Sequence, residues 1–444
     1  METSGFRKGD RIPIGQDFAE ISEYLGNGAQ GTVYMVKYRG DNYALKWYNH
    51  DAVPTADALA FRRDNLQKLA ERPSPDPAFV WPIAVTDVYR DSFGYIMPLI
   101  PESYEKLCNF LNLDSLNFSS FRGIVSSCLK FVSAFRNLGY AGLSYMDIND
   151  GNFFIDPDTD NVLICDNDNI APINTDMGIL GNPKYAAPEV VLGQNLPNTL
   201  SDRHSLAIII FQMLFSAHPL EGERWIGNDA SKENTDLVYV TDPVFIFDPA
   251  NGCNRPVKGM QNEAIDRWAL MPDYMRKLFC KAFSHLALKE DPNQRPTEND
   301  WLSALTRFSC SIALCDCGNE VFLKDSFSAE CDSPDCDNAV SVKYGLRLPA
   351  YVAPATAGAV ISRCQLGTCD VGRELDPLLL IVTKADDPSA AGAKNVSSDP
   401  ITVITPNNTE KTVAFGAAFP LMEGMRIMLC GTEVTVVSSG TSQI

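Results

Sequence analysis

Three glycines and a lysine near the N-terminus have the spacing of a phosphate-binding site. Gly26, Gly28 and Gly31 form a GxGxxGxV pattern, and Lys46 ends a short apolar stretch fifteen positions after the last glycine. Glycine lets a backbone approach phosphate oxygens closely and offer its amides, while a lysine supplies positive charge for the same oxygens. β-Branched and aromatic residues continue after Gly31, so the glycines should join two strands and not open a helix. The pattern predicts a nucleotide site; the alternative for Lys46 is an ordinary surface lysine.

Two aspartates and an asparagine follow far downstream. Asn152 stands five positions after Asp147, and Asp166 follows a short apolar strand. An aspartate can orient a hydroxyl and accept its proton, and carboxylate and amide oxygens are ligands of Mg²⁺. In this order and spacing, the pieces resemble the working parts of a protein kinase. The resemblance implies that ATP is the phosphate donor, that Asp147 is the catalytic aspartate aided by Lys46, and that Asn152 and Asp166 hold Mg²⁺ or Mn²⁺.

The resemblance also implies which residues contact the nucleotide. A strand at 94–100 would run into the hinge between two lobes, with Met97 at the back of the adenine pocket; the alternative is a core strand with no special role. The implied nucleotide-contacting residues are Gly26, Gly28, Gly31, Val33, Ala44, Lys46, Met97 and Leu99. Outside the pocket, Glu189 should pair with Arg295, and Asp202 should brace the catalytic loop.

The chain departs from the kinase pattern in two of its charged positions. The helix expected over 55–72 carries Asn65, with Asp64 beside it, where kinases place the glutamate that pairs with the strand lysine. An asparagine could hydrogen-bond Lys46 but not neutralise it, and Asp64 would have to reach it from an adjacent angle. Asn149 stands where serine/threonine kinases keep a lysine on the transferred phosphate, so transfer should be slow unless another cation replaces it.

The motif that usually reads D-F-G is altered as well. Here it is Asp166, Asn167 and Asp168, and Asp168 is a fallback or second metal ligand. The alternative for the whole segment is a solvated turn of Asx residues. Without the phenylalanine, the usual in/out switch of this motif lacks its hydrophobic anchor, so no such switch is expected.

The overall composition limits the classes of partner. The chain has 444 residues and a net charge of −19, which repels nucleic-acid backbones and anionic lipid, so neither nucleic acid nor a membrane is expected. The longest apolar run, 206–215, is too short to cross a bilayer and predicts a buried helix. The N-terminus lacks the apolar core of a signal peptide, which favours a cytoplasmic protein whose thirteen cysteines are mostly reduced.

Four cysteines after the kinase-like region have the spacing of a metal site. Cys315 and Cys317 form a CxC pair, and Cys331 and Cys336 form a CxxxxC pair. Thiolates on two tight turns can close a tetrahedral Zn²⁺ site, and four protein ligands leave no open position for catalysis. The pattern predicts a small structural zinc ribbon whose folding energy comes from the metal, on the order of 10 kcal/mol. Chance cysteines or a disulfide are the alternative.

From about residue 346, short apolar runs alternate with turn residues, and no long helical pattern is present. This texture is typical of a small β-sandwich of roughly a hundred residues. The expected strands are 378–382, 401–404, 411–415, 425–429 and 433–437. The last two loosely resemble the closing strands of a forkhead-associated domain, but a convincing set of phosphothreonine-binding side chains is not evident.

These features predict an α+β chain with a bilobal protein-kinase fold, then a small zinc ribbon and a C-terminal all-β, sandwich-like domain. The expected boundaries are 1–99 for the kinase N-lobe, 100–308 for the C-lobe, 309–345 for the ribbon-like module and 346–444 for the all-β domain.

Such a chain resembles the bacterial eukaryotic-like kinases of the tellurite-resistance-associated phosphorylation triad. The resemblance implies a von Willebrand A-domain protein as substrate and a PP2C-type phosphatase as antagonist. The function that follows is Mg-ATP-dependent transfer of the γ-phosphate to a serine or threonine hydroxyl of a protein. Two alternatives stay open: a nucleotide-binding pseudokinase scaffold, favoured by the altered motifs, and a small-molecule kinase of the same fold.

Overall fold

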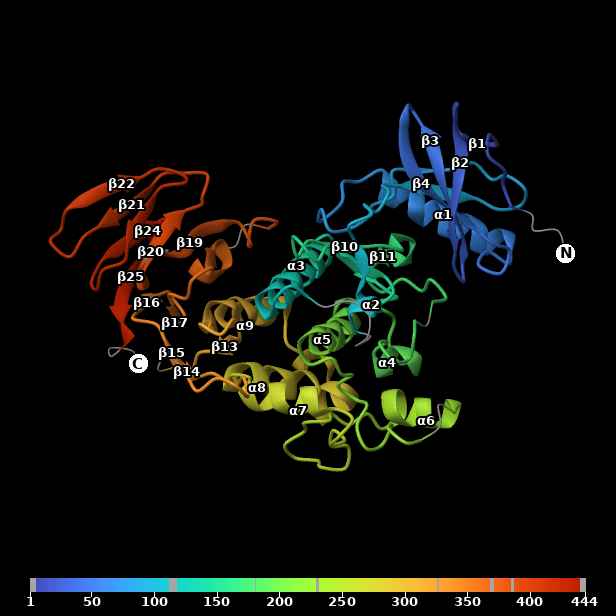
Figure 1. Cartoon of the computed structure of the whole chain (residues 1–444). Coiled ribbons are helices and arrows are strands. Elements are labelled where there is room, and N and C mark those ends of the chain that lie inside the picture. Colours follow the sequence, from blue (N-terminus) through green and yellow to red (C-terminus); the bar gives the residue numbers. More distant parts are fainter. Residues whose placement is uncertain are drawn as a thin grey trace.

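The N-terminal part of the chain is an antiparallel sheet with one helix beside it, drawn in blue in Figure 1. The structure is a computed structural model that describes residues 5–111, 118–179, 181–228, 231–325, 327–367, 371–384 and 387–439. The elements of this part are β1 (Arg11–Ile14), β2 (Asp17–Asn27), β3 (Gly31–Tyr38), β4 (Asp41–Tyr48), α1 (Ala56–Ala70), β5 (Ala84–Val85) and β6 (Gly94–Met97). The strands lie in the order β1-β2-β3-β4-β6-β5, and each neighbouring pair is antiparallel.

Helix α1 confirms the helix predicted over 55–72. Its first turn is capped by the Thr55 side chain, which accepts a hydrogen bond from a backbone amide within the helix. Its buried residues are Arg62, Asn65, Leu66 and Leu69, which share one face because they recur three and four positions apart. The two polar residues of this buried face, Arg62 and Asn65, take part in the contacts of the site described below.

The middle of the chain is mostly helical, drawn in cyan to yellow in Figure 1. Its helices are α2 (Leu107–Leu111), α3 (Phe121–Tyr140), α4 (Pro188–Val191), α5 (Thr199–Phe215), α6 (Lys232–Asp236), α7 (Asn262–Leu270), α8 (Asp273–Ala282) and α9 (Glu298–Ser311). Helix α5 begins with a capping box formed by Asn198 and Ser201. Every residue of the apolar run 206–215 is buried, so the predicted buried helix is confirmed.

Two small sheets within the helical part hold the loops that carry the predicted catalytic residues. Their strands are β7 (Glu105–Lys106), β8 (Leu143–Tyr145), β9 (Phe153–Ile155), β10 (Val162–Ile164) and β11 (Ile170–Pro172). One sheet has the order β10-β9-β7, and the other pairs β11 with β8. Because β8 and β9 flank one loop, and β10 and β11 flank the next, the two pairings bring these loops side by side.

Short hairpins and two larger sheets make up the rest of the chain. The elements are β12 (Ile312–Leu314), β13 (Glu320–Phe322), β14 (Ser328–Glu330), β15 (Ala339–Ser341), β16 (Tyr344–Arg347), β17 (Val352–Pro354), β18 (Val360–Ser362), β19 (Pro377–Lys384), β20 (Asp387–Asn395), β21 (Ile401–Ile404), β22 (Glu410–Val413), β23 (Ala418–Pro420), β24 (Arg426–Leu429) and β25 (Thr432–Ser438). The larger sheets have the orders β17-β16-β25-β24-β21-β22 and β18-β19-β20-β23. All five strands predicted in this part are strands in the structure.

The hydrophobic cores follow these parts of the chain. The largest buried cluster surrounds α3 and α5, and a separate cluster fills the space between the two C-terminal sheets and includes Cys310 of α9. The α+β class predicted from the sequence is therefore confirmed. Within the described residues, every helix is too short or too polar to serve as a membrane span.

Candidate active site

The glycine-rich turn joins β2 to β3, as predicted. A Cβ at Gly31 would lie 2.2 Å from the carbonyl oxygen of Trp47 on β4, so only glycine lets the two strands come this close. Gly26 and Gly28 have open space instead: the nearest atom to a Cβ at Gly28 would be 3.8 Å away. The close packing at Gly31 therefore fixes the end of the turn, and the space around Gly26 and Gly28 is open to a phosphate.

Four of the predicted nucleotide contacts gather in one hydrophobic cluster. Ala44 and Met97 are buried in it, and Val33 and Leu99 pack against it. The strand register explains this, because Ala44 lies opposite Met97 in the pairing of β4 with β6, and Val33 lies opposite Lys46 in the pairing of β3 with β4. The apolar residues and the lysine therefore belong to one region of the sheet.

Lys46 is a buried lysine, not a surface one. Its side chain is 5% exposed, and its ammonium lies 3.0 and 3.1 Å from the two carboxylate oxygens of Asp168 and 3.3 Å from Asp166 Oδ1. The Gln30 side-chain oxygen accepts a further hydrogen bond at 3.1 Å. Burial acts to lower the pKa of Lys46, but the two carboxylates outweigh it and raise the pKa. The ammonium stays charged and held in one place.

Asp168 is enclosed by donors and has no exposed surface. Besides Lys46, the hydroxyls of Tyr48 and Tyr95 donate to its two oxygens at 2.6 and 2.9 Å, and Arg62 Nη1 lies 3.5 Å from Oδ2. Burial works to raise the pKa of this carboxyl, but the cations and hydroxyl donors lower it overall. The alternative of a solvated turn is wrong, because Asn167, Asp168 and Asn169 have no exposed surface. The oxygens of Asp168 already accept bonds from Lys46 and two tyrosines, and its part as a metal ligand stays a prediction.

The expectation that Asn65 or Asp64 would approach Lys46 is also wrong. The Asn65 amide donates to the carbonyl oxygen of Ile170 at 2.8 Å, and Asp64 is an exposed residue that pairs with Lys68 on the outer face of α1. The helix instead sends a cation, Arg62, toward the site.

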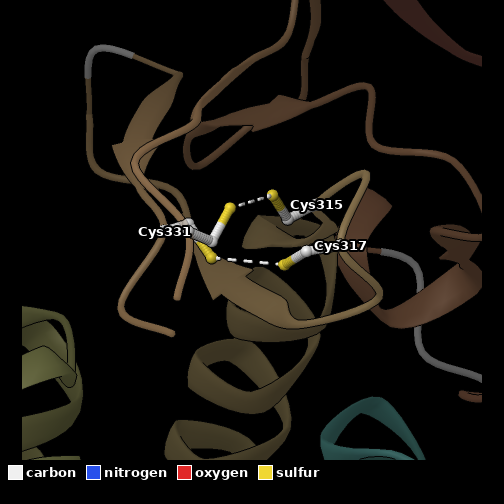
Figure 2. A group of neighbouring side chains, drawn as sticks. Cys315, Cys317 and Cys331 are labelled. Atoms are coloured by element: carbon white, nitrogen blue, oxygen red, sulfur yellow. Dashed lines mark hydrogen bonds between the residues drawn. The ribbon is translucent and has the colours of Figure 1, made fainter. Parts of the chain in front are cut away.

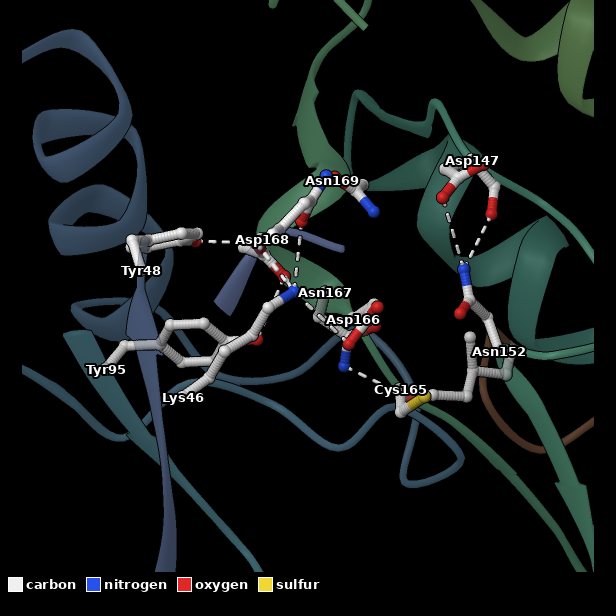
Figure 3. A network of polar contacts seen from close by, with 12 residues as sticks. Lys46, Tyr48, Tyr95, Asp147, Asn152, Cys165, Asp166, Asn167, Asp168 and Asn169 are labelled. Atoms are coloured by element: carbon white, nitrogen blue, oxygen red, sulfur yellow. Dashed lines mark hydrogen bonds and ion pairs between the residues drawn. The ribbon is translucent and has the colours of Figure 1, made fainter. Parts of the chain in front are cut away.

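Asp147 and Asn152 lie together in the loop between β8 and β9 (Figure 3). The Asn152 amide donates to the Asp147 carbonyl at 2.9 Å and approaches its carboxylate at 3.5 Å, which leaves the amide oxygen as the atom suited to a metal. Burial raises the pKa of Asp147, hydrogen bonding from Asn149 opposes this, and the charge of Asp166 adds to the rise.

The catalytic loop is braced from helix α5, as predicted. Asp202 accepts hydrogen bonds from the Tyr145 backbone amide at 3.1 Å and from the Ser144 hydroxyl at 3.3 Å. Burial raises the pKa of Asp202 well above its usual range. The brace fixes the end of β8 two residues before Asp147.

Asp166 is the more exposed of the two aspartates in this turn, although both carboxylates contact the Lys46 ammonium. Its backbone is left-handed, with φ 53° and ψ 41°, a conformation that aspartate adopts more readily than most residues. Its side chain keeps 37% of its surface exposed, against none for Asp168. Figure 3 shows Asp166 on the side of the network that faces Asp147 and Asn152. Burial still raises its pKa despite the opposing charge of Lys46.

The sequence interpretation missed four members of this network: Gln30, Tyr48, Arg62 and Tyr95. Period-2 and cross-strand geometry could have identified two of them. Tyr48 lies on the same face of β4 as Lys46, two positions later, and Tyr95 lies opposite Lys46 in the paired strand. Arg62 could have been found on the face of α1 that carries Asn65.

The four predicted metal-site cysteines converge at the β12–β13 and β14–β15 hairpins. The sulfurs of Cys315, Cys317, Cys331 and Cys336 all lie within 4.8 Å of one another. Figure 2 shows three of them labelled around a common centre. The Cys315–Cys336 and Cys317–Cys331 sulfur separations are 3.8 and 3.6 Å. Tetrahedral zinc with Zn–S bonds of about 2.3 Å requires sulfurs about 3.8 Å apart, so the donor set fits that ion.

The chain was compared with family models, curated proteins and solved structures. The family model described as protein kinase domain matches residues 19–305. Among solved structures, the crystal structure of the Mycobacterium tuberculosis PknI kinase domain has 16% identity and a TM-score of 0.45, covering 68% of this chain and 98% of that one. A single mutant of the same domain has 14% identity and a TM-score of 0.45, with the same coverage. No curated protein matches the chain. Because the family model spans well over half of the sequence, the chain belongs to the protein kinase family.

Proposed function

We propose that this kinase transfers the γ-phosphate of Mg-ATP to a serine or threonine hydroxyl of a protein. One observation carries the proposal: the buried Lys46 ammonium contacts Asp166, and Asp166 in turn faces the loop of Asp147 and Asn152. Phosphoryl transfer needs a cation for the phosphates, two oxygen ligands for a divalent ion and a carboxylate for the attacking hydroxyl.

In this proposal each residue has one task. Lys46 binds the α- and β-phosphates, Asp166 and the Asn152 amide oxygen hold Mg²⁺ or Mn²⁺, and Asp147 orients the hydroxyl and accepts its proton. The bound divalent ion would neutralise charge on the β- and γ-phosphate oxygens. The raised pKa of Asp147 moves this carboxyl toward the range in which a general base is useful.

The contacts of the nucleotide follow from the strand register. We propose that Val33, Ala44, Met97 and Leu99 hold the adenine, since they share one cluster beside Lys46. Gly26, Gly28 and Gly31 would offer backbone amides to the phosphates, since the turn is open at its first two glycines.

The loop does not supply the lysine that serine/threonine kinases use on the transferred phosphate. Asn149 stands there, and both ends of its amide are used locally: it donates to the Asp147 carbonyl at 3.0 Å and accepts from the Gly151 amide at 3.0 Å. We therefore propose a slow enzyme, because one charge that would stabilise the transition state is missing.

The test is transfer of labelled phosphate from γ-labelled ATP with Mg²⁺ and with Mn²⁺, comparing wild type with Asp147→Asn. An active kinase loses transfer in the variant but keeps nucleotide binding, because Asp147 acts on the hydroxyl and not on ATP. Nucleotide binding without transfer to any substrate, including the partner proposed below, would favour the pseudokinase scaffold. Transfer to a small-molecule hydroxyl alone would favour the third alternative.

We further propose that the four-cysteine cluster holds structural Zn²⁺, which makes 309–345 a ribbon-like module. In this proposal the two kinase lobes, 1–99 and 100–308, precede the module, and a separate all-β domain, 346–444, follows it. The sulfur separations support the metal, and the buried cluster shared by the two C-terminal sheets supports the domain. None of the described cysteines is in a disulfide, which fits a reducing cytoplasm. On the resemblance alone, we propose a von Willebrand A-domain protein as substrate and a PP2C-type phosphatase as antagonist.

A further inference from the structure

We infer that Asp168 does the work for which kinases use a helix glutamate: it is the positioning residue that holds Lys46, and Arg62 ties helix α1 to the same carboxylate. The inference rests on the proposed function, since it concerns how the phosphate-binding lysine is placed. The charge that the helix contributes is opposite to the one in the kinase pattern, where the helix supplies a glutamate. Here the helix contributes the cation Arg62, and the turn after β10 contributes the anion Asp168.

Helix α1 has no carboxylate on its buried face. That face carries Arg62 and Asn65 among its buried residues, while the acidic residues Asp57 and Asp64 are exposed. Asn65 is committed to the Ile170 carbonyl. Under these conditions the helix cannot neutralise Lys46, and a buried lysine without a counter-ion would be unstable.

Asp168 meets that need with a fixed carboxylate. Both of its oxygens accept hydrogen bonds from Lys46, and each also accepts one from a buried tyrosine, Tyr95 on Oδ1 and Tyr48 on Oδ2. Because the two tyrosines come from β6 and β4, the sheet itself sets the orientation of the carboxylate. Figure 3 shows the tyrosines and Lys46 converging on Asp168 from the sheet.

The two carboxylates near Lys46 are thereby divided between two tasks. Asp166 is the more exposed and faces the catalytic loop, so it is the one able to bind a divalent ion. Asp168 has no exposed surface and stays with Lys46. The lysine thus keeps a dedicated partner whether or not Asp166 is engaged elsewhere.

The contact from the helix is the looser one. Arg62 Nη1 lies 3.5 Å from Asp168, and this buried nitrogen has no hydrogen bond among the described residues, whereas Lys46 makes two bonds of 3.0 and 3.1 Å to the same carboxylate. Arg62 also lies over the Tyr48 ring, 5.3 Å from its centroid. A displacement of α1 would therefore break the Arg62 contact first and leave Lys46 in place.

The first experiment compares Asp168→Asn, Asp168→Glu and Arg62→Gln in the full chain, with Asp64→Asn on the outer face of α1 as the matched control. KM for ATP, kcat and KM for the protein substrate are measured. Asp168→Asn should raise KM for ATP and lower kcat, so that kcat/KM for ATP falls on the order of 10- to 100-fold. KM for the protein substrate should not change. Asp168→Glu should recover part of the loss, because it restores the charge. Arg62→Gln should have a smaller effect, and Asp64→Asn none.

A second readout does not depend on catalysis. The acylation rate of Lys46 by acetic anhydride, followed by mass spectrometry in nucleotide-free protein, should increase in Asp168→Asn, because the amine loses the carboxylate that holds it in the buried network and becomes accessible to the reagent. It should stay near the wild-type rate in Arg62→Gln, while amide exchange in α1 becomes faster. Tyr48→Phe, which removes one hydroxyl donor without changing shape, should give an intermediate rate and serves if Asp168→Asn does not fold.

The outcomes separate the two proposals. Wild-type protein that transfers no phosphate overturns the proposed function, and Lys46 acylation still decides the role of Asp168. Folded Asp168→Asn protein with wild-type Lys46 reactivity and wild-type KM for ATP overturns the inference, as does release of Lys46 by Arg62→Gln to the same extent as by Asp168→Asn.

Discussion

The Arg295 guanidinium forms two hydrogen bonds with the Glu189 carboxylate, 2.7 and 2.8 Å long, although 106 positions separate the two residues. Arg295 is 1% exposed and also donates to the backbone carbonyls of Ala287 and Leu200. The pair therefore links the short helix α4, the start of α5 and the turn before α9. The sequence interpretation of this pair as a structural one is confirmed by the contact.

Breaking this buried pair should destabilise the kinase region strongly. Arg295→Gln leaves the Glu189 carboxylate buried without its cation, which costs about 3–5 kcal/mol in the free energy of unfolding. The measurement is urea-induced unfolding followed by tryptophan fluorescence. Arg276→Gln is the matched control, since Arg276 pairs with Asp273 at the surface and its loss should change the midpoint little. Equal midpoints for the two variants would contradict the prediction.

A buried histidine should make stability depend on pH. Burial, which disfavours the imidazolium, lowers the pKa of His218 from 6.5 to about 4. The neutral ring bonds to the Lys184 carbonyl through Nε2 at 2.9 Å and accepts from the Leu220 amide at 3.2 Å. Between pH 6.5 and 4 the unfolded chain binds a proton at this position and the folded chain does not. The contribution is therefore complete above pH 6.5 and is lost as the pH falls toward 4, by about 3 kcal/mol.

The measurement for His218 is the urea midpoint at a series of pH values, in wild type and in His218→Gln. The variant should show a shallower fall in stability between pH 6.5 and 4. His285→Gln is the control, because His285 is 63% exposed and has no comparable burial. A pH profile of His218→Gln that runs parallel to that of wild type is the contrary result.

The sequence predicted those parts of the fold that a local pattern determines. Helix α5 follows from an apolar run broken only by Gln212, and the strands β19, β21, β24 and β25 follow from short apolar runs between turns. Strand β20 was not predicted, since its residues are mostly small and have weak strand preference; pairing with β19 makes it a strand. Helix α6 was missed as well, because five residues in a polar segment show no periodicity.

The sequence predicted which residues form the candidate site, but not which of them contact one another. Lys46, Asp147, Asn152 and Asp166 have the motif spacing, and the structure brings them together. The role of Asp168 could not be read from its neighbours along the chain, because four acidic or amide residues in a row, 166–169, favour a solvated turn. Its burial arises from contacts with strands β4 and β6 and with Arg62 of helix α1, all of which lie more than seventy positions away in the sequence.

Removal of the metal should unfold the four-cysteine module first. Purified chain should contain one zinc ion per molecule, and Cys317→Ser should lose it, because three thiolates and a hydroxyl do not complete a tight structural site. The check is metal content by mass spectrometry together with amide exchange over 312–341, which should become fast in the variant and in chelator-treated wild type. Cys253→Ser, at an exposed cysteine outside the cluster, should keep the metal. A wild-type chain free of zinc, with slow exchange over 312–341, would falsify the metal-dependent folding of this module.

The last prediction concerns Glu374, a carboxylate with no exposed surface just before β19. Its Oε1 accepts a hydrogen bond of 2.6 Å from the Ser133 hydroxyl, and its Oε2 lies 3.2 Å from Arg136 Nη1, so the contact joins the C-terminal part of the chain to the middle of helix α3. Glu374→Gln keeps the shape and the bond from Ser133 but removes the negative charge that faces Arg136. We expect faster amide exchange over 371–384 and a loss of about 3 kcal/mol or more in unfolding free energy.

Glu423→Gln, at an exposed position, should change neither. The double variant Arg136→Leu with Glu374→Met should recover much of the stability, because replacing both members of a buried pair by apolar side chains removes the cost of burying their charges. Slow exchange over 371–384 in Glu374→Gln would show that apolar packing of this segment on α3, through Leu375, is sufficient without the ion pair.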